Sequence, residues 1–405
     1  MSNIFKVTDL VAKEAQRVAH ESLQFIATTD RQYDKTMDNE GGVKGGSIRV
    51  KKPNMYLRRQ GSRVMDVQDQ SEETQTVTVA IQDGVDMRFN SVELVQSVDN
   101  PAKFDDLSKN YITPAIKSMV SGIEADYIAA CTKATYNLVG TAGTALTGGT
   151  VPGLARARLN QNLAPKDGQR YVQVDSNAMA GIVNGIATFF NPVADVSKAF
   201  REGMIGRNAM ADWYENDRMW TLPNSADVAG EINAGTLTSG ITSLTVDGLT
   251  VAPVAGMVFT VEGTYDIHPE TKIAYPHLKQ FVCAAGCTTT NLVFTPALIY
   301  DTTNPRQNCS GAPTDNDDIT FVGSLSTNYA QQLMYHKEAY QFTTQALPIM
   351  DDAHKCVRTM QDNLSLRVWM ASDIRNDELL MRVDILYGMT ALRPEWGCRM
   401  IGAAG

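Results

Sequence analysis

The sequence predicts an α+β protein built from a long helix, an extended two-stranded arm and a β-rich segment inserted late in the chain. The apolar residues that follow Thr113-Pro114 recur at steps of three and four, and proline suits the first helical turn. Apolar and polar residues instead alternate at residues 48–50 and 76–81, which indicates strands. Residues 225–322 hold short β-like runs broken by Gly, Pro and Asn, a pattern typical of a small barrel or sandwich.

The predicted arm has a strong charge asymmetry. Its outgoing limb and tip carry the basic residues Arg49, Lys51, Lys52, Arg58, Arg59 and Arg63. Its return limb carries the acidic residues Asp66, Asp69, Glu72, Glu73, Asp83 and Asp86. An isolated two-stranded ribbon is only marginally stable in water, so we expect the arm to rest on another surface. That surface is either another copy of the chain or the protein's own domain, and the residues alone leave both open.

The composition is that of a globular protein without strong attraction to nucleic acid. The 405 residues include 36 basic and 45 acidic side chains, which gives a formal charge of −9. A basic patch is compatible with this balance, but an overall attraction to polyanions is not favoured. The first residues lack the pattern of a signal peptide, and no apolar run is long enough to span a membrane. The six scattered cysteines are interpreted as reduced thiols of a protein made in a cytosol.

No stretch has the pattern of a catalytic or metal-binding motif. Cys283, Cys287 and Cys309 with His277 are the candidates for a zinc site, but the C-x3-C spacing is not that of a paired knuckle. The acidic loop at residues 314–318 lacks the full calcium-loop series. We therefore predict no catalytic residues, no cofactor and no metal.

Three local predictions concern the second half of the chain. Residues 328–342 are predicted to form a helix that begins after Asn328. Asp247-Gly248 is predicted to turn a hairpin. In the last predicted strand, Arg382 and Asp384 are two residues apart, so they lie on the same face and are able to pair.

Three stretches carry a resemblance to a known family. The first, at residues 200–214, contains Gly206 and Arg207, and the second, at residues 333–342, contains His336 and Lys337. The third, at residues 365–400, contains Asp373, Arg382, Asp384, Tyr387, Gly388, Arg393 and Pro394. With the order of the predicted elements, these stretches resemble the major capsid (coat) proteins of tailed bacteriophages. The resemblance is strongest to the coat family of short-tailed phages (podoviruses) that carries an inserted β-barrel domain.

The resemblance implies the tailed-phage major capsid fold, divided into six parts. These are an N-terminal helical arm and hinge at 1–45, an extended β-arm (E-loop) at 46–90, a spine-helix peripheral domain at 91–140, the first part of an axial α/β domain at 141–224, an inserted β-barrel domain at 225–327, and a return to the axial and peripheral domains at 328–405.

The resemblance also implies a function. Copies of the chain are expected to self-assemble as hexamers and pentamers into an icosahedral shell around double-stranded DNA, which they contact without sequence specificity. The family further implies a scaffolding protein, a portal, assembly in the bacterial host cytoplasm, and a place in the virion capsid without any membrane. The basic residues of the arm are expected to contact a neighbouring subunit.

Other readings stay open at this point. A cellular nanocompartment shell has the same fold but encloses an enzyme. An enzyme with a β-rich binding domain would need a convergent set of catalytic side chains, which the spacing does not supply. A crosslink from Lys51 or Lys52 to an Asn of a neighbour is not favoured, because no motif identifies that Asn.

Overall fold

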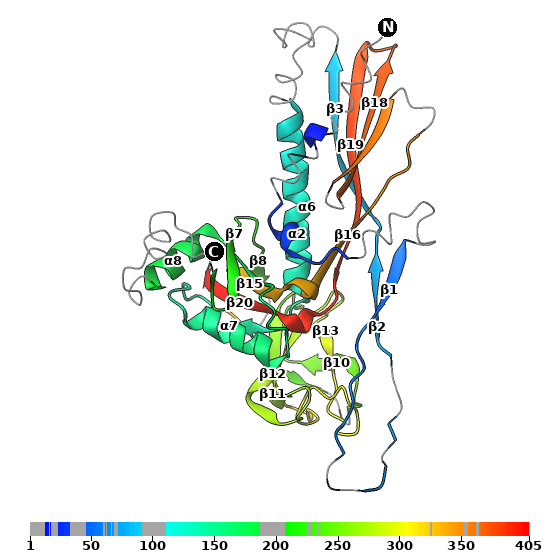
Figure 1. Cartoon of the computed structure of the whole chain (residues 1–405). Coiled ribbons are helices and arrows are strands. Elements are labelled where there is room, and N and C mark those ends of the chain that lie inside the picture. Colours follow the sequence, from blue (N-terminus) through cyan, green and yellow to red (C-terminus); the bar gives the residue numbers. More distant parts are fainter. Residues whose placement is uncertain are drawn as a thin grey trace. The chain divides into compact units, whose positions relative to one another are not determined.

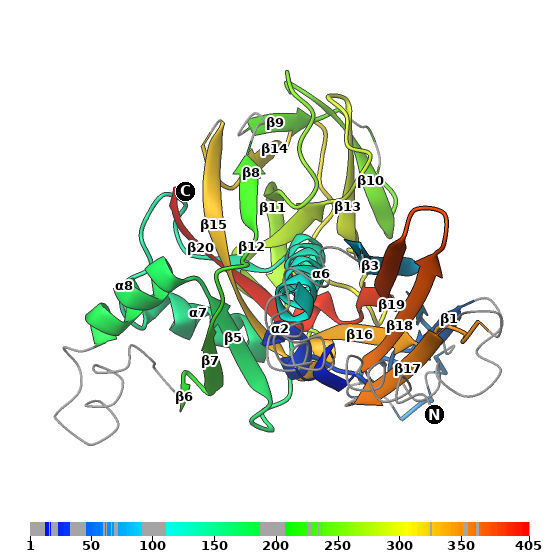
Figure 2. The same ribbon diagram turned by 90° about the horizontal axis from the view of Figure 1, so that it is seen from above.

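Figures 1 and 2 show the helices and strands of the computed structural model. It describes all residues except 1–12, 16, 18–22, 33–45, 60, 62, 66, 69–71, 91–110, 187–206, 225–228, 234, 236, 325, 351–354, 362–363 and 405. Most of the predicted N-terminal helical arm and Gly206 therefore lie outside the described residues. In the part of the chain that is described, no helix is long and apolar enough to cross a bilayer.

The chain divides into two compact units. The first comprises Met1–Val50, Thr76–Tyr127 and Gln341–Thr390, and the second comprises Lys51–Gln75, Ile128–Tyr340 and Ala391–Gly405. The boundary between the two units falls inside the long helix α6 (Thr113–Ala134). The presence of α6 confirms the predicted helix and its start at Thr113-Pro114. The arm strands β1 (Ser47–Lys51) and β2 (Thr74–Thr78) pair in a two-stranded sheet, as predicted.

The first unit is built on a five-stranded antiparallel sheet. Its strands are β3 (Ile81–Asn90), β16 (Tyr340–Gln345), β17 (Lys355–Gln361), β18 (Leu364–Asp373) and β19 (Glu378–Ala391). The order is β16-β19-β18-β17, and β3 also pairs with β19. The short helix α2 (Phe25–Thr28) also belongs to this unit.

A row of aromatic rings holds the helices of the first unit to its sheet. Phe25 on α2 lies 4.9 Å from Tyr127 on α6, measured between ring centroids. Tyr127 lies 5.3 Å from Phe342 on β16, which in turn stacks on Tyr387 of β19 at 5.4 Å. The buried carboxylate of Glu124 also accepts the backbone N–H of Phe25. Contacts of this kind combine apolar burial with a preferred ring geometry, so they fix where the helices lie.

The second unit contains a seven-stranded sheet covered by two helices. The strands are β4 (Leu138–Val139), β20 (Gly397–Ala404), β15 (Thr327–His336), β5 (Arg170–Val174), β7 (Ala211–Glu215), β6 (Arg207–Asn208) and, paired with β15, β8 (Thr221–Asn224). The helices are α7 (Thr150–Gln161) and α8 (Ser176–Ile186). Leu159 of α7 and Ile182 of α8 share one buried apolar cluster with Val172 and Met334 of the sheet.

The helix predicted for residues 328–342 is wrong. This segment forms strand β15, one 3₁₀ turn η2 (Lys337–Ala339) and strand β16. β15 is a central strand that pairs with β20 and with β5 and β8, and most of its residues are buried. A strand that is buried on both faces loses its alternation, so periodicity alone cannot distinguish it from a buried helix.

A closed six-stranded barrel completes the second unit, in agreement with the β-rich segment predicted there. Its strands, in barrel order, are β10 (Ile241–Asp247), β13 (Asn291–Leu298), β12 (Ala274–Cys283), β11 (Val258–Ile267), β14 (Asp318–Phe321) and β9 (Ala229–Ile232). Phe259 packs against Phe281, Phe294 and Phe321 at centroid distances of 5.6, 5.7 and 5.6 Å. The predicted Asp247-Gly248 hairpin is wrong, because β10 ends at Asp247 and pairs with β13 and β9 instead.

Candidate inter-subunit contact site

The tip of the arm, defined here as residues 53–68, presents basic and apolar side chains to solvent. Arg58, Arg59 and Arg63 are exposed. The exposed apolar side chains of the tip are Met55, Tyr56, Val64, Met65 and Val67, with 48, 57, 77, 77 and 78% of their surface accessible. Exposed apolar side chains gathered in one place, with charges around them, mark a contact surface more often than a free one.

The base of the arm differs from its tip because its lysines have partners within the chain. Lys51 Nζ lies 2.7 Å from Glu72 Oε2, and Lys52 Nζ lies 3.3 Å from Glu73 Oε1. Glu73 also pairs with Arg306, which precedes barrel strand β14. Two of the six basic residues predicted to contact a neighbour are thus engaged at the base of the arm.

The three arginines of the tip are placed differently. Arg59 donates to the backbone carbonyl of Val64, which shapes the tip itself. Among the residues that the structure describes, Arg58 and Arg63 form no ion pair, and Arg49 on β1 is likewise exposed without one. Among the described residues of the arm, the basic side chains available to a neighbouring surface are therefore those of the tip and Arg49.

In the first unit, the predicted pair of Arg382 and Asp384 is present and belongs to a larger ion-pair group. Arg382 Nε lies 2.6 Å from Asp384 Oδ1. The second carboxylate oxygen of Asp384 accepts from Arg367 Nη2 at 2.6 Å. Asp384 is fully buried, and the two guanidinium groups donate to both of its carboxylate oxygens in place of water. Sequence spacing identified the first partner; Arg367, on the neighbouring strand β18, follows from the strand register.

Two further residues of the C-terminal motif serve close packing. Tyr387 is buried and its pKa is raised to about 12, first by burial and then by the charges of Asp83 and Asp126. Gly388 lies against β2: a Cβ there would come within 2.1 Å of the carbonyl oxygen of Thr78. Asp373 accepts the backbone N–H of Arg375 at 2.9 Å, which fixes the turn between β18 and β19.

In the second unit, His336 at the end of β15 contacts the loop that precedes β5. His336 is buried, and its Nδ1 accepts from the backbone of Glu338 at 3.3 Å. The ring proton therefore lies on Nε2, which donates to Asp167 Oδ1 at 3.1 Å. Burial alone would raise the pKa of Asp167, but hydrogen bonds from the backbone of Gln169 and from His336 lower it.

Arg393 and Pro394, two of the remaining motif residues, lie in the connection into β20. Pro394 begins the 3₁₀ turn η3 (Pro394–Trp396), and the guanidinium of Arg393 lies 4.1 Å from the Trp396 ring centroid. The backbone N–H of Lys337 donates to the carbonyl of Gln169 at 3.0 Å. Arg207 Nη1 lies 3.4 Å from Asp212 Oδ1 across the β6–β7 hairpin. All of these contacts position backbone, and none is arranged for chemistry on a substrate.

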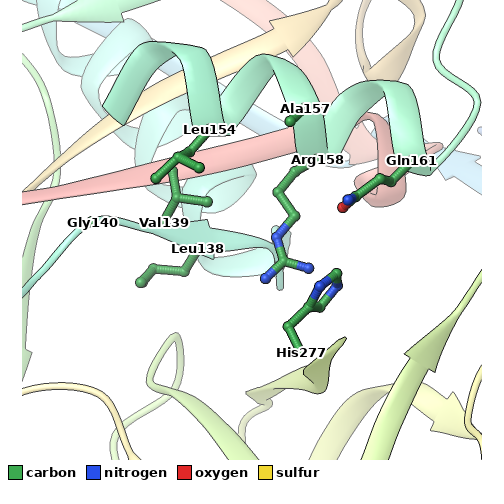
Figure 3. A pocket seen from close by; sticks show the side chains of 8 residues that line it. All are labelled: Leu138, Val139, Gly140, Leu154, Ala157, Arg158, Gln161 and His277. Carbon is green, nitrogen blue, oxygen red and sulfur yellow. The ribbon is translucent and has the colours of Figure 1, made fainter. Parts of the chain in front are cut away.

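Sequence reasoning missed one charged cluster, which surrounds Asp266 of barrel strand β11. Lys279 Nζ lies 2.9 Å, His277 Nε2 3.4 Å and Arg158 Nη1 4.0 Å from its carboxylate oxygens. Figure 3 shows Arg158 reaching down from α7 toward His277 of β12, on the wall of a pocket of about 330 Å³. Burial would raise the pKa of Asp266, but the charge of Lys279 and the hydrogen bond from His277 outweigh it and lower that pKa.

This cluster joins α7 to the barrel and does not constitute a metal site. Within the described residues, no group of three or more His, Cys, Asp and Glu side chains has the geometry to hold a metal ion. His277 pairs with Asp266, while Cys283 and Cys309 lie in the barrel core. The described side chains thus form ion pairs and packing contacts within the chain, and those of the arm tip are exposed for contact with another surface.

Comparison with known proteins gives these contacts their context. Residues 224–402, somewhat less than half of the chain, match the family described as P22 coat protein, gene protein 5. No curated protein matches the chain.

Solved structures with a similar fold come from several phages. The chain resembles a structure of Mycobacterium phage Che8 with a TM-score of 0.49 and 12% identity, over 93% of this chain and 90% of that one. It resembles the capsid of Ralstonia phage GP4 with a TM-score of 0.48 and 7% identity, over 93% and 87%. For the capsid of cyanophage P-SCSP1u the values are 0.45 and 11%, over 88% and 83%.

The protein is a structural one, a coat subunit that forms a shell in the virion capsid together with other copies of itself. The narrower finding is the family match, which covers residues 224–402 and therefore the barrel and the C-terminal part of the chain. This match confirms the resemblance to tailed-phage major capsid proteins. The motif residues at 333–342 and 365–400 fall within the matched segment.

Proposed function

We propose that this coat protein assembles as hexamers and pentamers into an icosahedral shell that encloses double-stranded DNA. The observation that carries the proposal is the arm tip, whose basic and apolar side chains have no surface of their own to cover them. Contacts between an arm and a different surface of the next subunit are heterologous. Repeated contacts of this kind close into rings, and the rings close into a shell.

The six-part division predicted from the sequence is part of the proposal. The arm reaches a neighbour, and the glycine-rich hinge before it permits rearrangement from a precursor to a mature shell. The inserted barrel stabilises its own subunit and contacts neighbours. The closed barrel and its links to α7 through Asp266 support a rigid connection of this domain to its subunit.

The proposed partners are a scaffolding protein, a portal and the packaged DNA, with assembly in the cytoplasm of the bacterial host. The formal charge of −9 supports containment of DNA without strong attraction. A protein that neutralised many phosphates would bind DNA tightly and in a salt-dependent manner, which would hinder packing.

Charge reversal at the arm tip tests the proposal. The triple change Arg58→Glu, Arg59→Glu and Arg63→Glu is expected to abolish shells in electron micrographs and to leave a slowly sedimenting, folded subunit. The matched control Arg58→Lys, Arg59→Lys and Arg63→Lys keeps the positive charge and is expected to form shells. Normal shells from the glutamate variant would show that the arm tip does not make the assembly contact.

The contents of the shell distinguish a virion from a cellular compartment. Particles made with the protein's own operon are treated with nuclease, and the protected material is then extracted. Protected double-stranded DNA is the expected result. Particles filled with one host protein would contradict DNA enclosure while leaving shell formation intact.

A further inference from the structure

Two cysteines lie together where barrel strand β12 ends. Cys283 is the last residue of β12 and is 2% exposed, and Cys287 lies in the turn that follows and is partly buried against the same barrel core. Each thiol shifts the pKa of the other, and both side chains pack against the same barrel core. Cys287 Sγ also lies 3.2 Å from the carbonyl oxygen of Val293 and 3.4 Å from that of Ala284. These contacts hold the Cys287 sulfur over the turn, next to Cys283.

We propose that Cys283 and Cys287 are a modification site that forms an intrachain disulfide when the protein meets a low-molecular-weight disulfide such as oxidised glutathione. The two residues are four apart in a turn, where Gly286 has a φ of +97° and allows the chain to reverse tightly. A disulfide needs Cα atoms about 4.4–6.8 Å apart, and a reversal of the chain within four residues brings its ends toward each other.

The electrostatic surroundings favour reaction at Cys287. Its pKa is lowered to about 7, mainly by the hydrogen bond from Cys283, so much of it is thiolate at neutral pH. Its partial exposure gives a dissolved reagent access. The fully buried Arg399 donates to the carbonyl oxygen of Gly256 at 2.7 Å, and the N–H of Gly256 donates to the carbonyl oxygen of Cys283 at 2.8 Å. Arg399 thereby brings a positive charge close to Cys283.

The reaction is a thiol–disulfide exchange in two steps. The Cys287 thiolate attacks one sulfur of glutathione disulfide, whose S–S bond breaks and releases one glutathione thiolate. Cys283 then loses its proton to solvent, and its sulfur attacks the Cys287 sulfur of the mixed disulfide and releases the second glutathione. Two protein thiols are oxidised and one glutathione disulfide is reduced to two thiols.

Cys283 becomes a better nucleophile after the first step. In the reduced protein its pKa is raised, first by its hydrogen bond to Cys287 and then by burial. The mixed disulfide has no thiolate at position 287, so the first of these causes disappears, and the nearby charge of Arg399 continues to lower the pKa. Cys287 thus acts as the attacking cysteine and Cys283 as the resolving one.

The other buried thiols serve as internal controls. Burial raises the pKa of both Cys309 and Cys398 to about 12, so they stay protonated at neutral pH. Cys131 is also buried, and Cys356 is partly exposed on strand β17 of the other unit. A reagent that reacted only by access would modify Cys356 at least as fast as Cys287.

The test is to incubate the purified full-length chain with oxidised glutathione at pH 7 and to map its peptides by mass spectrometry. The expected result is the loss of two of the six thiols, with Cys283 joined to Cys287, and full recovery with dithiothreitol. Retention of all six thiols, or a bond between other cysteines, would overturn the proposal.

Two variants separate the roles of the cysteines. Cys283→Ser is expected to stop at a stable glutathione adduct on Cys287, and Cys287→Ser to form neither adduct nor disulfide. Cys356→Ser is the matched control and should behave as the wild type does. If a barrel variant does not fold, timed alkylation of the wild type with iodoacetamide at pH 7 replaces it. Faster labelling of Cys287 than of the other five cysteines supports the proposal, and equal or slower labelling refutes it.

Discussion

At the scale of single residues, Asp384 is a charged group buried within the sheet of the first unit. Its carboxylate is fully buried and is held by Arg367 and Arg382 at 2.6 Å each. Removing one member of a buried ion pair leaves the other charges without compensation in a medium of low dielectric constant. Removing Asp384 alone is therefore expected to destabilise the sheet. Replacing the whole ion-pair group by apolar side chains would cost less, because a buried ion pair stabilises little relative to an apolar core.

We predict that Asp384→Ala lowers the free energy of unfolding by about 3–5 kcal/mol. The measurement is urea unfolding of the unassembled subunit, followed by tryptophan fluorescence. Asp86→Asn is the matched control, because Asp86 is 79% exposed and lies 3.8 Å from Arg382. Its effect is expected to stay within about 0.5 kcal/mol. Equal effects of the two changes would mean that burial does not decide the role of Asp384.

From the lowered pKa of Asp266, we predict that the second unit loses stability in acid. Burial opposes ionisation, but Lys279 and His277 lower the pKa of Asp266 below its ordinary value. The folded form therefore binds this proton less readily than the unfolded form does. The resulting stability is present above the unfolded-state pKa of about 4 and is lost as the pH falls through the lower folded-state pKa.

Thermal unfolding between about pH 3 and pH 7 measures this effect. Asp266→Asn is expected to be less stable than the wild type at neutral pH but to lose less stability on acidification. Asp247→Asn, at an exposed position at the end of β10, should follow the wild-type curve. A wild-type and an Asp266→Asn curve that run parallel would contradict the assignment.

At the scale of elements, the contact between β19 and β2 depends on the absence of a side chain at position 388. A Cβ on Gly388 would lie 2.1 Å from the carbonyl oxygen of Thr78, a backbone atom that cannot turn away. We predict that Gly388→Ala costs about 1–3 kcal/mol of stability, the usual range for overpacking.

Gly122 provides the opposite case. It is exposed in the middle of α6, and a Cβ there would meet no atom within 4 Å. Gly122→Ala is predicted to stabilise the subunit by about 0.5–1 kcal/mol through helix propensity. Chemical denaturation of both variants distinguishes the cases. A stabilising Gly388→Ala would show that β2 shifts easily.

At the scale of the whole molecule, the barrel is the part most able to fold by itself. It is closed, most of its buried core residues come from its own strands, and β9 pairs with β14, so its two ends lie side by side. We predict that residues 225–327 made as a separate protein fold cooperatively. Circular dichroism and the dispersion of amide NMR signals measure this.

The control for the separate barrel is Phe259→Ala, which removes a ring that touches three other aromatic rings in the core. A loss of about 3–5 kcal/mol is expected, enough to unfold a small domain. A separate barrel that is unstructured before mutation would mean that its contacts with the rest of the second unit are required for folding.

The sequence determined the features whose cause is local. The helix after Thr113-Pro114 and the arm strands followed from periodicity and from the preference of proline for a helix start. The pairing of Arg382 with Asp384 followed from the two-residue period of a strand. The C-terminal motif placed the chain near the tailed-phage coat proteins, because a run of specific residues has few alternative explanations.

Only the tertiary structure decided features that join distant residues. β15 is a strand because β20, β5 and β8 supply its hydrogen-bond partners. The periodicity of its own sequence does not reveal these partners. The pKa of the buried Asp266 is lowered because β12 brings Lys279 and His277 to it. Local patterns encode which face of an element is apolar. The partner that covers that face, and the charges it delivers, depend on chain segments far away in sequence.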